Sequence, residues 1–178
     1  YLALVERIRT MDPRLVLTAD IIAGFCSETD AEFFDTYRLL EQVRYHSAFV
    51  FVYSERPNTI AARKFTDDVP REVKSQRVTA LVELQRRIST ERNREYLGET
   101  LAVLVEGDAK KSPLQAMGKS DGNITVIWNK KDLPCRPGQS IACSIYDASA
   151  STLYARAISS IDPSPSKNEH SCTNTVQS

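Results

Sequence analysis

Few side chains in this sequence have the type and spacing that enzyme chemistry requires. His46 and His170 are the two histidines of the 178-residue chain, and neither belongs to a serine–histidine–aspartate set. The sequence contains neither a GxGxxG motif nor a phosphate-binding P-loop. Enzyme chemistry in this chain would therefore need a cofactor that brings its own reactivity, and no catalytic residue is assigned.

The cysteines do not form a metal-binding pattern. No two are spaced as CxxC among the four present, which are Cys26, Cys135, Cys143 and Cys172. This spacing argues against a zinc site, and a disulfide scaffold is not expected in a chain of this length. We expect free thiols in a reducing compartment and no metal ligands. The adjacent carboxylates Asp67 and Asp68 are interpreted as helix caps and not as an acid–base pair.

Residues 18–29, TADIIAGFCSET, combine a strand, a glycine turn and the start of a helix. The apolar run IIA does not alternate, which is typical of a strand buried on both faces. Gly24 permits a close backbone approach or a positive φ, and Thr29 with Glu32 has the spacing of a capping box. Ligands bind at such turns in parallel α/β sheets. Most strand–glycine–helix turns, however, are only structural.

The elements around this turn predict an incomplete parallel sheet. Helices are predicted at 1–11, 30–45 and 70–95, strands at 15–24 and 48–53, and a loop at 54–68. Two apolar strands joined by a helix form a parallel βαβ unit. A stable parallel sheet needs further strands, so these must lie upstream or come from another chain. Helical spacing already begins at Tyr1, so we expect a fragment that starts within a helix.

The long helix at 70–95 is predicted to have an apolar inward face and a solvated charged face. Its inward stripe consists of Val78, Leu81, Val82, Gln85 and Ile88. Gly98 is the expected C-cap of this helix, and the domain boundary is placed there.

Beyond this boundary the hydrophobic period changes to two, which predicts a small β-barrel of about five short strands. Four strands are placed at 101–107, 123–128, 140–148 and 152–159. Five lysines offer a local basic patch: Lys110, Lys111, Lys119, Lys130 and Lys131. Two interpretations stay open, namely RNA binding with an exposed Trp128, or ordinary surface lysines with Trp128 in the core.

Composition narrows the function classes. Lys plus Arg and Asp plus Glu both number 23, so the formal net charge is zero and any nucleic-acid site must be local. No apolar run approaches the length of a membrane span, and no signal peptide is recognised. Residues 160–178 are rich in Ser and poor in large apolar side chains, so disorder is predicted for them.

Three stretches, in this order, resemble one enzyme family. They are DIIAGFCSET at 20–29, YSERPNTIAA at 53–62 with KFTDDVPREVKSQR at 64–77, and LVEGDAKKS at 104–112 with GKSDGN at 118–123. Together they resemble the C-terminal half of the methylthiotransferases, which are radical S-adenosylmethionine enzymes with a C-terminal TRAM domain. The likeness is nearest the branch that acts on N6-(dimethylallyl)adenosine in tRNA. Branches that act on threonylcarbamoyladenosine tRNA or on a ribosomal protein fit less well.

The resemblance implies a fold and a reaction. Residues 1–96 would be the C-terminal strands and helices of an α/β partial (β/α) barrel, 97–159 an all-β TRAM barrel that binds tRNA, and 160–178 a tail. In this family a [4Fe-4S] cluster on a CxxxCxxC motif cleaves S-adenosylmethionine reductively, and a second [4Fe-4S] cluster takes part in sulfur insertion. The product carries a methylthio group at C2 of the modified adenosine near the anticodon.

The resemblance also implies what this chain lacks. Neither set of cluster cysteines is in the sequence, so the chain is not expected to be active alone. It would need N-terminal cluster domains, a reductant and a sulfur donor. The expected compartment is the cytoplasm, or the mitochondrion or plastid of a eukaryote, with no membrane partner.

Candidate cofactor-binding residues follow from the same resemblance. They are Ile22, Gly24, Glu28, Tyr53, Ser54 and Arg56. The first three fall in the strand-end motif that lies along the adenine side of the cofactor: Ile22 would pack on the ring and Gly24 would let backbone approach it. Glu28 would either support the turn or act directly. Arg56 would meet a carboxylate or a tRNA phosphate, or form a structural ion pair.

Candidate RNA contacts lie in the barrel. Lys110, Lys111, Lys119 and Asn123 match positions that are usually basic or polar in the family. We expect phosphate contacts, which supply affinity and not sequence recognition. Two turns depart from the family pattern, because Ser27 and Asn58 stand where glycine is common.

Two other functions stay open. One is a non-enzymatic RNA-binding protein with a degenerate helical scaffold, which would be a monomer that binds RNA and no cofactor. The other is a sister methylthiotransferase acting on a ribosomal protein, whose barrel would hold protein in place of RNA.

Overall fold

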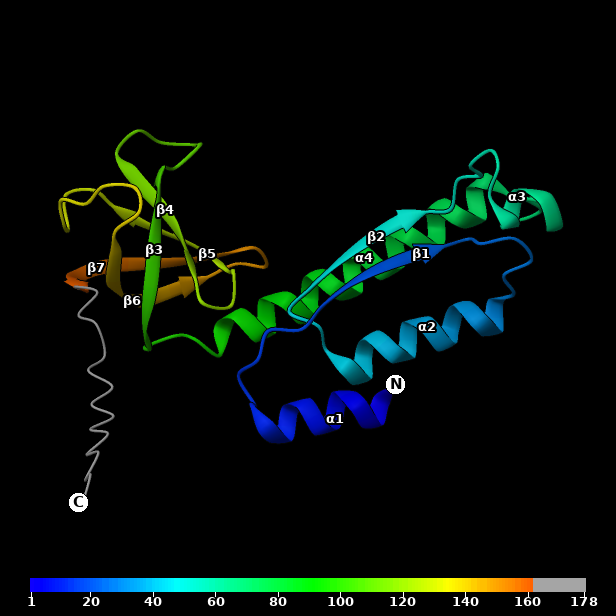
Figure 1. The fold of residues 1–178 in the computed structure, drawn as a ribbon, viewed down its shortest axis with the longest axis horizontal. Coiled ribbons are helices and arrows are strands. Elements are labelled where there is room, and N and C mark those ends of the chain that lie inside the picture. Colours follow the sequence, from blue (N-terminus) through cyan, green and yellow to red (C-terminus); the bar gives the residue numbers. More distant parts are fainter. Residues whose placement is uncertain (162–178) are drawn as a thin grey trace, which may run out of the picture.

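The chain folds into an α/β part followed by a β-barrel, described for residues 1–161 by a computed structural model (Figure 1). The α/β part contains α1 (Leu2–Met11), β1 (Thr18–Ala23), α2 (Asp30–Val43), β2 (Ser47–Val52), α3 (Ile60–Lys64) and α4 (Arg71–Arg94). The barrel contains β3 (Thr100–Asp108), β4 (Gln115–Ser120), β5 (Thr125–Asn129), β6 (Ser140–Ala148) and β7 (Thr152–Ile161). Figure 1 shows the barrel at one end of α4, with β1 and β2 running along that helix.

Local sequence signals set both ends of α2. The Thr29 hydroxyl accepts the Glu32 N–H at 3.3 Å, and the Glu32 carboxylate accepts the Thr29 N–H at 2.9 Å. Both halves of the predicted capping box are therefore present. The helix ends at Arg44, whose φ of 50° is left-handed and whose N–H is donated to the Leu40 carbonyl.

β1 and β2 pair in parallel along their whole length, which confirms the predicted βαβ unit. The prediction that β1 is buried on both faces is wrong for the described chain. Helices α2 and α4 cover one face, whereas Ile22, Phe49 and Phe51 on the other face are 58%, 61% and 52% exposed. These two strands do not close a barrel, so the partial (β/α) barrel stays a prediction.

Helix α4 packs on β2 and α2, but its inward face differs from the predicted stripe. Leu81, Gln85 and Ile88 are buried as predicted, whereas Val82 is 46% exposed and Leu84 is buried in its place. The charged outer face is solvated as predicted, with Arg71, Glu83 and Arg87 among its exposed residues, but Lys74 and Arg77 are buried on the inward face. These two residues continue the buried stripe toward the start of the helix. Within residues 1–161, no helix is both long and apolar enough to cross a membrane.

The barrel is closed and its strands follow the order β3-β4-β5-β7-β6. All neighbouring pairs are antiparallel except β5 and β7, which run parallel. Trp128 is 1% exposed and packs in the core with Val126, Ile141 and Leu153. The interpretation in which Trp128 presents an exposed ring is therefore wrong.

Two elements of the structure, β4 and α3, are not predicted by the sequence patterns. β4 was not placed, because its sequence QAMGKS is mostly polar and contains Gly118. That glycine is required, since a Cβ there would collide with the Leu104 carbonyl oxygen of the neighbouring strand. The five-residue α3 lies within the predicted loop, where the Thr59 hydroxyl caps it by accepting the Ala62 N–H at 3.2 Å.

The connection between the two parts is held by polar contacts. α4 ends at Arg94 and its C-cap is Glu95, not Gly98, so the predicted C-cap is wrong. Gly98 has a φ of +84° and donates its N–H to the Ile145 carbonyl at 2.9 Å, which turns the chain into the barrel. The Asn93 amide donates to the Ser149 carbonyl at 2.7 Å. Strand β7 continues to Ile161, past the predicted start of the tail, and the rest of that tail lies outside the described residues.

Candidate functional site

The turn that follows β1 is built around Gly24 and Glu28. Gly24 has a φ of +76°, and its N–H is donated to the Glu28 carboxylate at 2.8 Å. The Glu28 N–H is donated to the Phe25 carbonyl at 2.9 Å. The turn therefore closes on itself through one largely buried carboxylate, and support of the turn is one of the two roles considered for Glu28.

Helix α4 holds this turn with two buried cations. Arg77 donates to the Glu28 carboxylate at 2.7 Å and to the exposed Asp30 carboxylate at 2.7 Å. The Lys74 side chain packs against Gly24 so closely that a Cβ on Gly24 would collide with its Cγ. Gly24 is thus required by its positive φ and by contact with Lys74.

Tyr53, the first residue after β2, lies beside the turn that follows β1. The Tyr53 N–H is donated to the Ala23 carbonyl at 2.9 Å, so β2 ends beside the glycine turn. The Tyr53 ring meets the Phe25 ring edge-on at 4.9 Å, and the Lys74 ammonium lies 5.1 Å from the Tyr53 ring centre. Lys74 also forms an ion pair with Asp67.

The Tyr53 hydroxyl is a buried polar atom without a hydrogen bond of good geometry within residues 1–161. The neighbouring Cys26 thiol, together with desolvation, raises the pKa of Tyr53 to about 12. The phenol is therefore neutral at physiological pH and can donate a hydrogen bond. An unpaired buried donor of this kind points to a ligand or to another segment of protein.

An open pocket of about 570 Å³ lies beside Tyr53, at the carboxyl end of β2. Its lining residues are Val52, Tyr53, Ser54, Glu55, Asp67, Asp68, Val69, Pro70, Arg71 and Lys74. Of the candidate cofactor residues, Tyr53 and Ser54 line this pocket and Gly24 packs directly behind it on Lys74. Ile22 points from the uncovered sheet face, and Arg56 lies in an exposed loop with no ion pair among the described residues.

The two departures from the family pattern both adopt left-handed backbone. Ser27 has a φ of 62° and Asn58 a φ of 67°, so each non-glycine residue keeps a glycine-like turn. Asp68 stabilises Ser27 by accepting its N–H at 2.6 Å and its hydroxyl at 3.0 Å, and these bonds lower the pKa of Asp68. The interpretation of Asp67 and Asp68 as helix caps is wrong, because α4 begins after Pro70 without a side-chain cap and both carboxylates have other partners.

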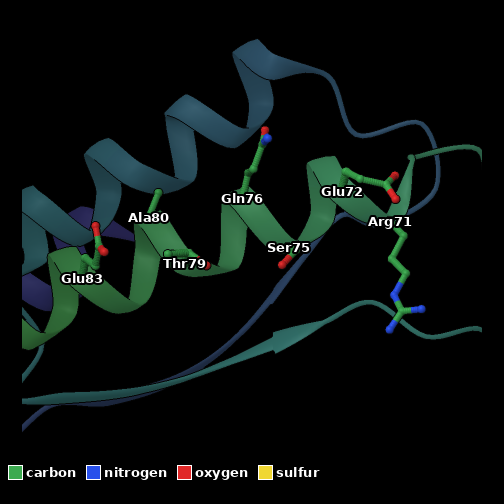
Figure 2. Close-up of a pocket in the computed structure, with 7 residues that line it drawn as sticks. All are labelled: Arg71, Glu72, Ser75, Gln76, Thr79, Ala80 and Glu83. Atoms are coloured by element: carbon green, nitrogen blue, oxygen red, sulfur yellow. The ribbon is translucent and has the colours of Figure 1, made fainter.

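A second hollow, of about 660 Å³, lies along the exposed side of α4 (Figure 2). It is lined by Arg71, Glu72, Ser75, Gln76, Thr79, Ala80 and Glu83. In Figure 2 Gln76 points toward α2, and all the labelled side chains come from this one helix. It contains none of the candidate cofactor residues.

The barrel does not gather its candidate RNA contacts at one place. Lys110 and Lys111 lie in the β3–β4 loop, at the top of the barrel in Figure 1. Lys119 and Asn123 lie toward the other end of β4, where the Lys119 ammonium donates to the Thr125 hydroxyl at 2.9 Å. Four residues of strand separate Lys119 from the start of β4, a distance of roughly 13 Å at about 3.3 Å per residue. The Lys110–Lys111 pair and the Lys119–Asn123 pair are therefore separate positions on the barrel.

Sequence reasoning missed the two buried cations that organise the cofactor turn. Lys74 and Arg77 extend the buried stripe of Leu81, Leu84 and Ile88 by helical steps of three and four, and this spacing was the available signal. The two residues were not expected at buried positions, because Lys and Arg are rarely buried without partners. The partners, Asp67 and Glu28, are set by tertiary structure.

Comparison with known proteins relates both parts of the chain to one enzyme. No family model matches the chain. The tRNA-2-methylthio-N(6)-dimethylallyladenosine synthase of Porphyromonas gingivalis is 44% identical over 158 residues, which cover 89% of this chain and 34% of the relative. The synthases of Chlorobium limicola and Chloroherpeton thalassium are 41% and 40% identical over 86% and 89% of the chain. The chain is homologous to the C-terminal part of these synthases.

The chain spans about a third of the length of these synthases. The matched segment covers 89% of the chain, so it includes most of the α/β part and of the barrel. This family is a radical S-adenosylmethionine family with iron–sulfur clusters. The turn after β1 and the loop after β2 both lie within the segment that is homologous to these synthases.

Of the cofactors of this synthase family, the described residues suit S-adenosylmethionine but not an iron–sulfur cluster. The unpaired Tyr53 hydroxyl and the pocket beside it suit a polar, nucleoside-sized ligand. Iron–sulfur clusters do not fit, because residues 1–161 contain no group of three or more His, Cys, Asp or Glu side chains able to hold a metal. Cys26, Cys135 and Cys143 are free thiols, and burial raises the pKa of Cys143 to about 12.

Proposed function

We propose that this chain is the C-terminal part of a tRNA methylthiotransferase that adds a methylthio group to C2 of N6-(dimethylallyl)adenosine. The observation that carries the proposal is identity of 38–44% to synthases of that name along most of the chain. The turn geometry supports it, because Gly24, Glu28 and Tyr53 meet at the carboxyl end of two parallel strands, where ligands bind in such sheets. The names of the relatives do not favour the RNA-binding protein or the ribosomal-protein enzyme.

In this proposal residues 1–96 form one side of the cavity of a partial (β/α) barrel that binds S-adenosylmethionine. Bound S-adenosylmethionine, with the iron–sulfur clusters, supplies the radical chemistry. Cysteines outside this chain would hold two [4Fe-4S] clusters. A reductant and a sulfur donor complete the reaction, in the cytoplasm or in an organelle that modifies its own tRNA.

The residues of this chain would bind and orient the nucleoside end of the cofactor. Ile22 packs on the adenine from the uncovered sheet face, and the neutral Tyr53 hydroxyl donates a hydrogen bond. Glu28 acts through the turn, because its carboxylate is already occupied by the Gly24 N–H and Arg77. Ser54 and Arg56 contribute polar contacts from the loop after β2, Arg56 to a carboxylate or a phosphate.

The cofactor assignment can be tested in the full-length protein that carries this chain, by S-adenosylmethionine binding in equilibrium dialysis. Tyr53→Phe removes a hydroxyl without a described partner, so the fold is retained and the cofactor should bind about tenfold more weakly. Tyr37→Phe on α2 is the matched control and should bind like the parent. Equal binding by the Tyr53→Phe variant would contradict the proposed role of Tyr53.

Residues 97–159 would form the TRAM domain that binds tRNA, with phosphate contacts from Lys110, Lys111, Lys119 and Asn123. Each phosphate neutralised by a lysine adds about 0.9 to the slope of log K against log salt concentration. A Lys111→Ala/Lys119→Ala double variant should therefore bind tRNA more weakly with a slope reduced by about two. Arg7→Ala/Arg38→Ala, on α1 and α2, removes the same charge and should leave the slope unchanged. An unchanged slope in the barrel variant would refute this role, and displacement by a ribosomal protein in place of tRNA would favour the sister enzyme.

A further inference from the structure

The outer face of three neighbouring barrel strands carries an ordered set of nine side chains. Strands β4, β5 and β7 lie side by side, and their register places three residues in each row across them. The middle row is Met117, Ile127 and Tyr154, and the row on one side is Lys119, Thr125 and Thr152. The row on the other side pairs Gln115 with Asn129, and Arg156 follows Ala155, the last paired residue of β7, at the same level. We call this surface the β4–β5–β7 face.

The apolar middle row is not needed for the barrel core. Side chains alternate along each strand, so the residues between these rows point inward and are buried; Val126, Trp128 and Leu153 are at most 1% exposed. The residues of the middle row stay partly exposed and lie outside the core cluster. A thioether, an aliphatic side chain and a phenol ring are therefore presented together to solvent.

The charge of this face suits a polyanion. Lys119 and Arg156 stand in opposite flanking rows, and the nine positions include no carboxylate. Carboxylates lie only at its borders: Asp147 is opposite Tyr154 on β6, and Glu106 and Asp108 flank Gly107, which is opposite Met117 on β3. The Lys119 ammonium is held on the face by the Thr125 hydroxyl at 2.9 Å. Arg156 has no ion pair among residues 1–161, so its charge is available to a ligand.

From this arrangement we infer that the β4–β5–β7 face binds a single-stranded segment of RNA, with a base stacked on Tyr154. Unstacked bases pack on aromatic rings and apolar side chains, while neighbouring cations bind the phosphates. The Gln115 and Asn129 amides can hydrogen-bond base edges. The inference rests on the proposed function and deepens it, because it assigns the tRNA contact to a strand surface in addition to the lysines of the β3–β4 loop.

The test is tRNA binding by the full chain, measured by fluorescence anisotropy with a labelled anticodon stem-loop. Tyr154→Ala should weaken binding about tenfold, because one stacked base is lost. Tyr154→Phe keeps the ring and should bind within about twofold of the parent. Phe34→Ala is the matched control, since Phe34 is a 54% exposed aromatic residue on α2 and its loss should change nothing. Thermal unfolding of each variant verifies that the barrel is retained.

A direct readout of stacking uses Tyr154→Trp. Trp128 is the single tryptophan of the chain and is buried, so the emission of an added exposed indole can be separated from it. Quenching of that emission by single-stranded RNA, and much less by an RNA duplex of equal length, is expected.

The outcomes separate the two proposals. A parent chain that binds no tRNA would refute the proposed role of the barrel. A parent that binds tRNA, together with a Tyr154→Ala variant that binds equally well while Lys110→Ala/Lys111→Ala binds weakly, would overturn the inference and leave the proposed function intact. Equal quenching by duplex and single strand would also overturn it.

Discussion

The Arg77 guanidinium binds both ends of Glu28: its Nη1 lies 2.7 Å from the Glu28 carboxylate and 2.9 Å from the Glu28 carbonyl oxygen. Both side chains are largely buried, at 7% and 12% exposure. The same carboxylate accepts the Gly24 N–H. Arg77 therefore adds the charged contact by which helix α4 holds the turn after β1, beside the packing of Lys74 on Gly24. The shape of the candidate cofactor site thus depends on a helix that continues to the barrel.

Replacing Arg77 should destabilise the fold strongly. Arg77→Met leaves the Glu28 carboxylate buried without its cation, and breaking such a pair from one side costs about 3 kcal/mol. Arg87→Met is the matched control, because the Arg87–Glu41 pair is solvent-exposed and is expected to contribute no more than about 0.5 kcal/mol. Urea unfolding of both variants measures the difference. Similar losses in the two variants would contradict the organising role of Arg77.

Adding one methyl group at Gly24 should be costly for two reasons. Gly24→Ala places a Cβ at a φ of +76° and drives it into the Lys74 side chain. Gly138→Ala has a comparable φ of +86° but open space around the new Cβ. We expect a loss of about 1 kcal/mol for the Gly138 variant, from backbone strain alone, and at least about 2 kcal/mol for the Gly24 variant. Equal losses in thermal unfolding would show that contact with Lys74 is unimportant.

Much of the fold was predictable because local chemistry decides it. The Thr29–Glu32 capping box defines where α2 starts, and the apolar strands before and after α2 can only pair in parallel. Alternating apolar residues placed β6 at its observed bounds. In these elements, the local sequence pattern and the tertiary packing favour the same secondary structure.

The remaining features depend on partners distant in sequence. No sequence pattern singles out Lys74, which is buried because Asp67 and the Tyr53 ring receive its charge. The sequence of β4 does not predict a strand, because Gly118 is typical of a turn. In the structure this glycine is needed because a Cβ would collide with the Leu104 carbonyl oxygen. The candidate lysines were grouped by sequence, whereas β4 separates Lys111 from Lys119 in space. Each case is settled by a contact between segments that sequence pattern alone does not pair.

His46 should make stability depend on pH in the acid range. Burial, with help from Arg92, lowers the pKa of His46 to about 4, and its Nδ1 accepts the Leu17 N–H at 3.3 Å. The folded pKa lies below the unfolded value of about 6.5. The unfolded chain therefore binds the extra proton first, and stability falls as pH drops from about 6.5 to about 4.

The measurement is the free energy of unfolding of the parent chain and of His46→Asn at several pH values. The parent should lose up to about 3 kcal/mol more than the variant across this range, because only the unfolded parent gains a proton on His46 that the folded parent does not bind. Above pH 6.5 the difference between the two proteins should be constant. A difference that stays constant down to pH 4 would contradict the low pKa of His46.

The last prediction concerns the joint between α4 and the barrel. The Asn93 side chain is 4% exposed and donates its amide to the Ser149 carbonyl, so Asn93→Ala leaves that carbonyl without its donor. We expect a loss of about 1 kcal/mol and, more specifically, faster hydrogen exchange at the Gly98 amide, which also crosses this joint to Ile145. Gln76→Ala, on the exposed side of the same helix, should leave that exchange rate unchanged (Figure 2). If Asn93→Ala accelerates exchange throughout the barrel equally, the residue stabilises the whole fold; if it acts at the joint alone, α4 and the barrel are coupled through this contact.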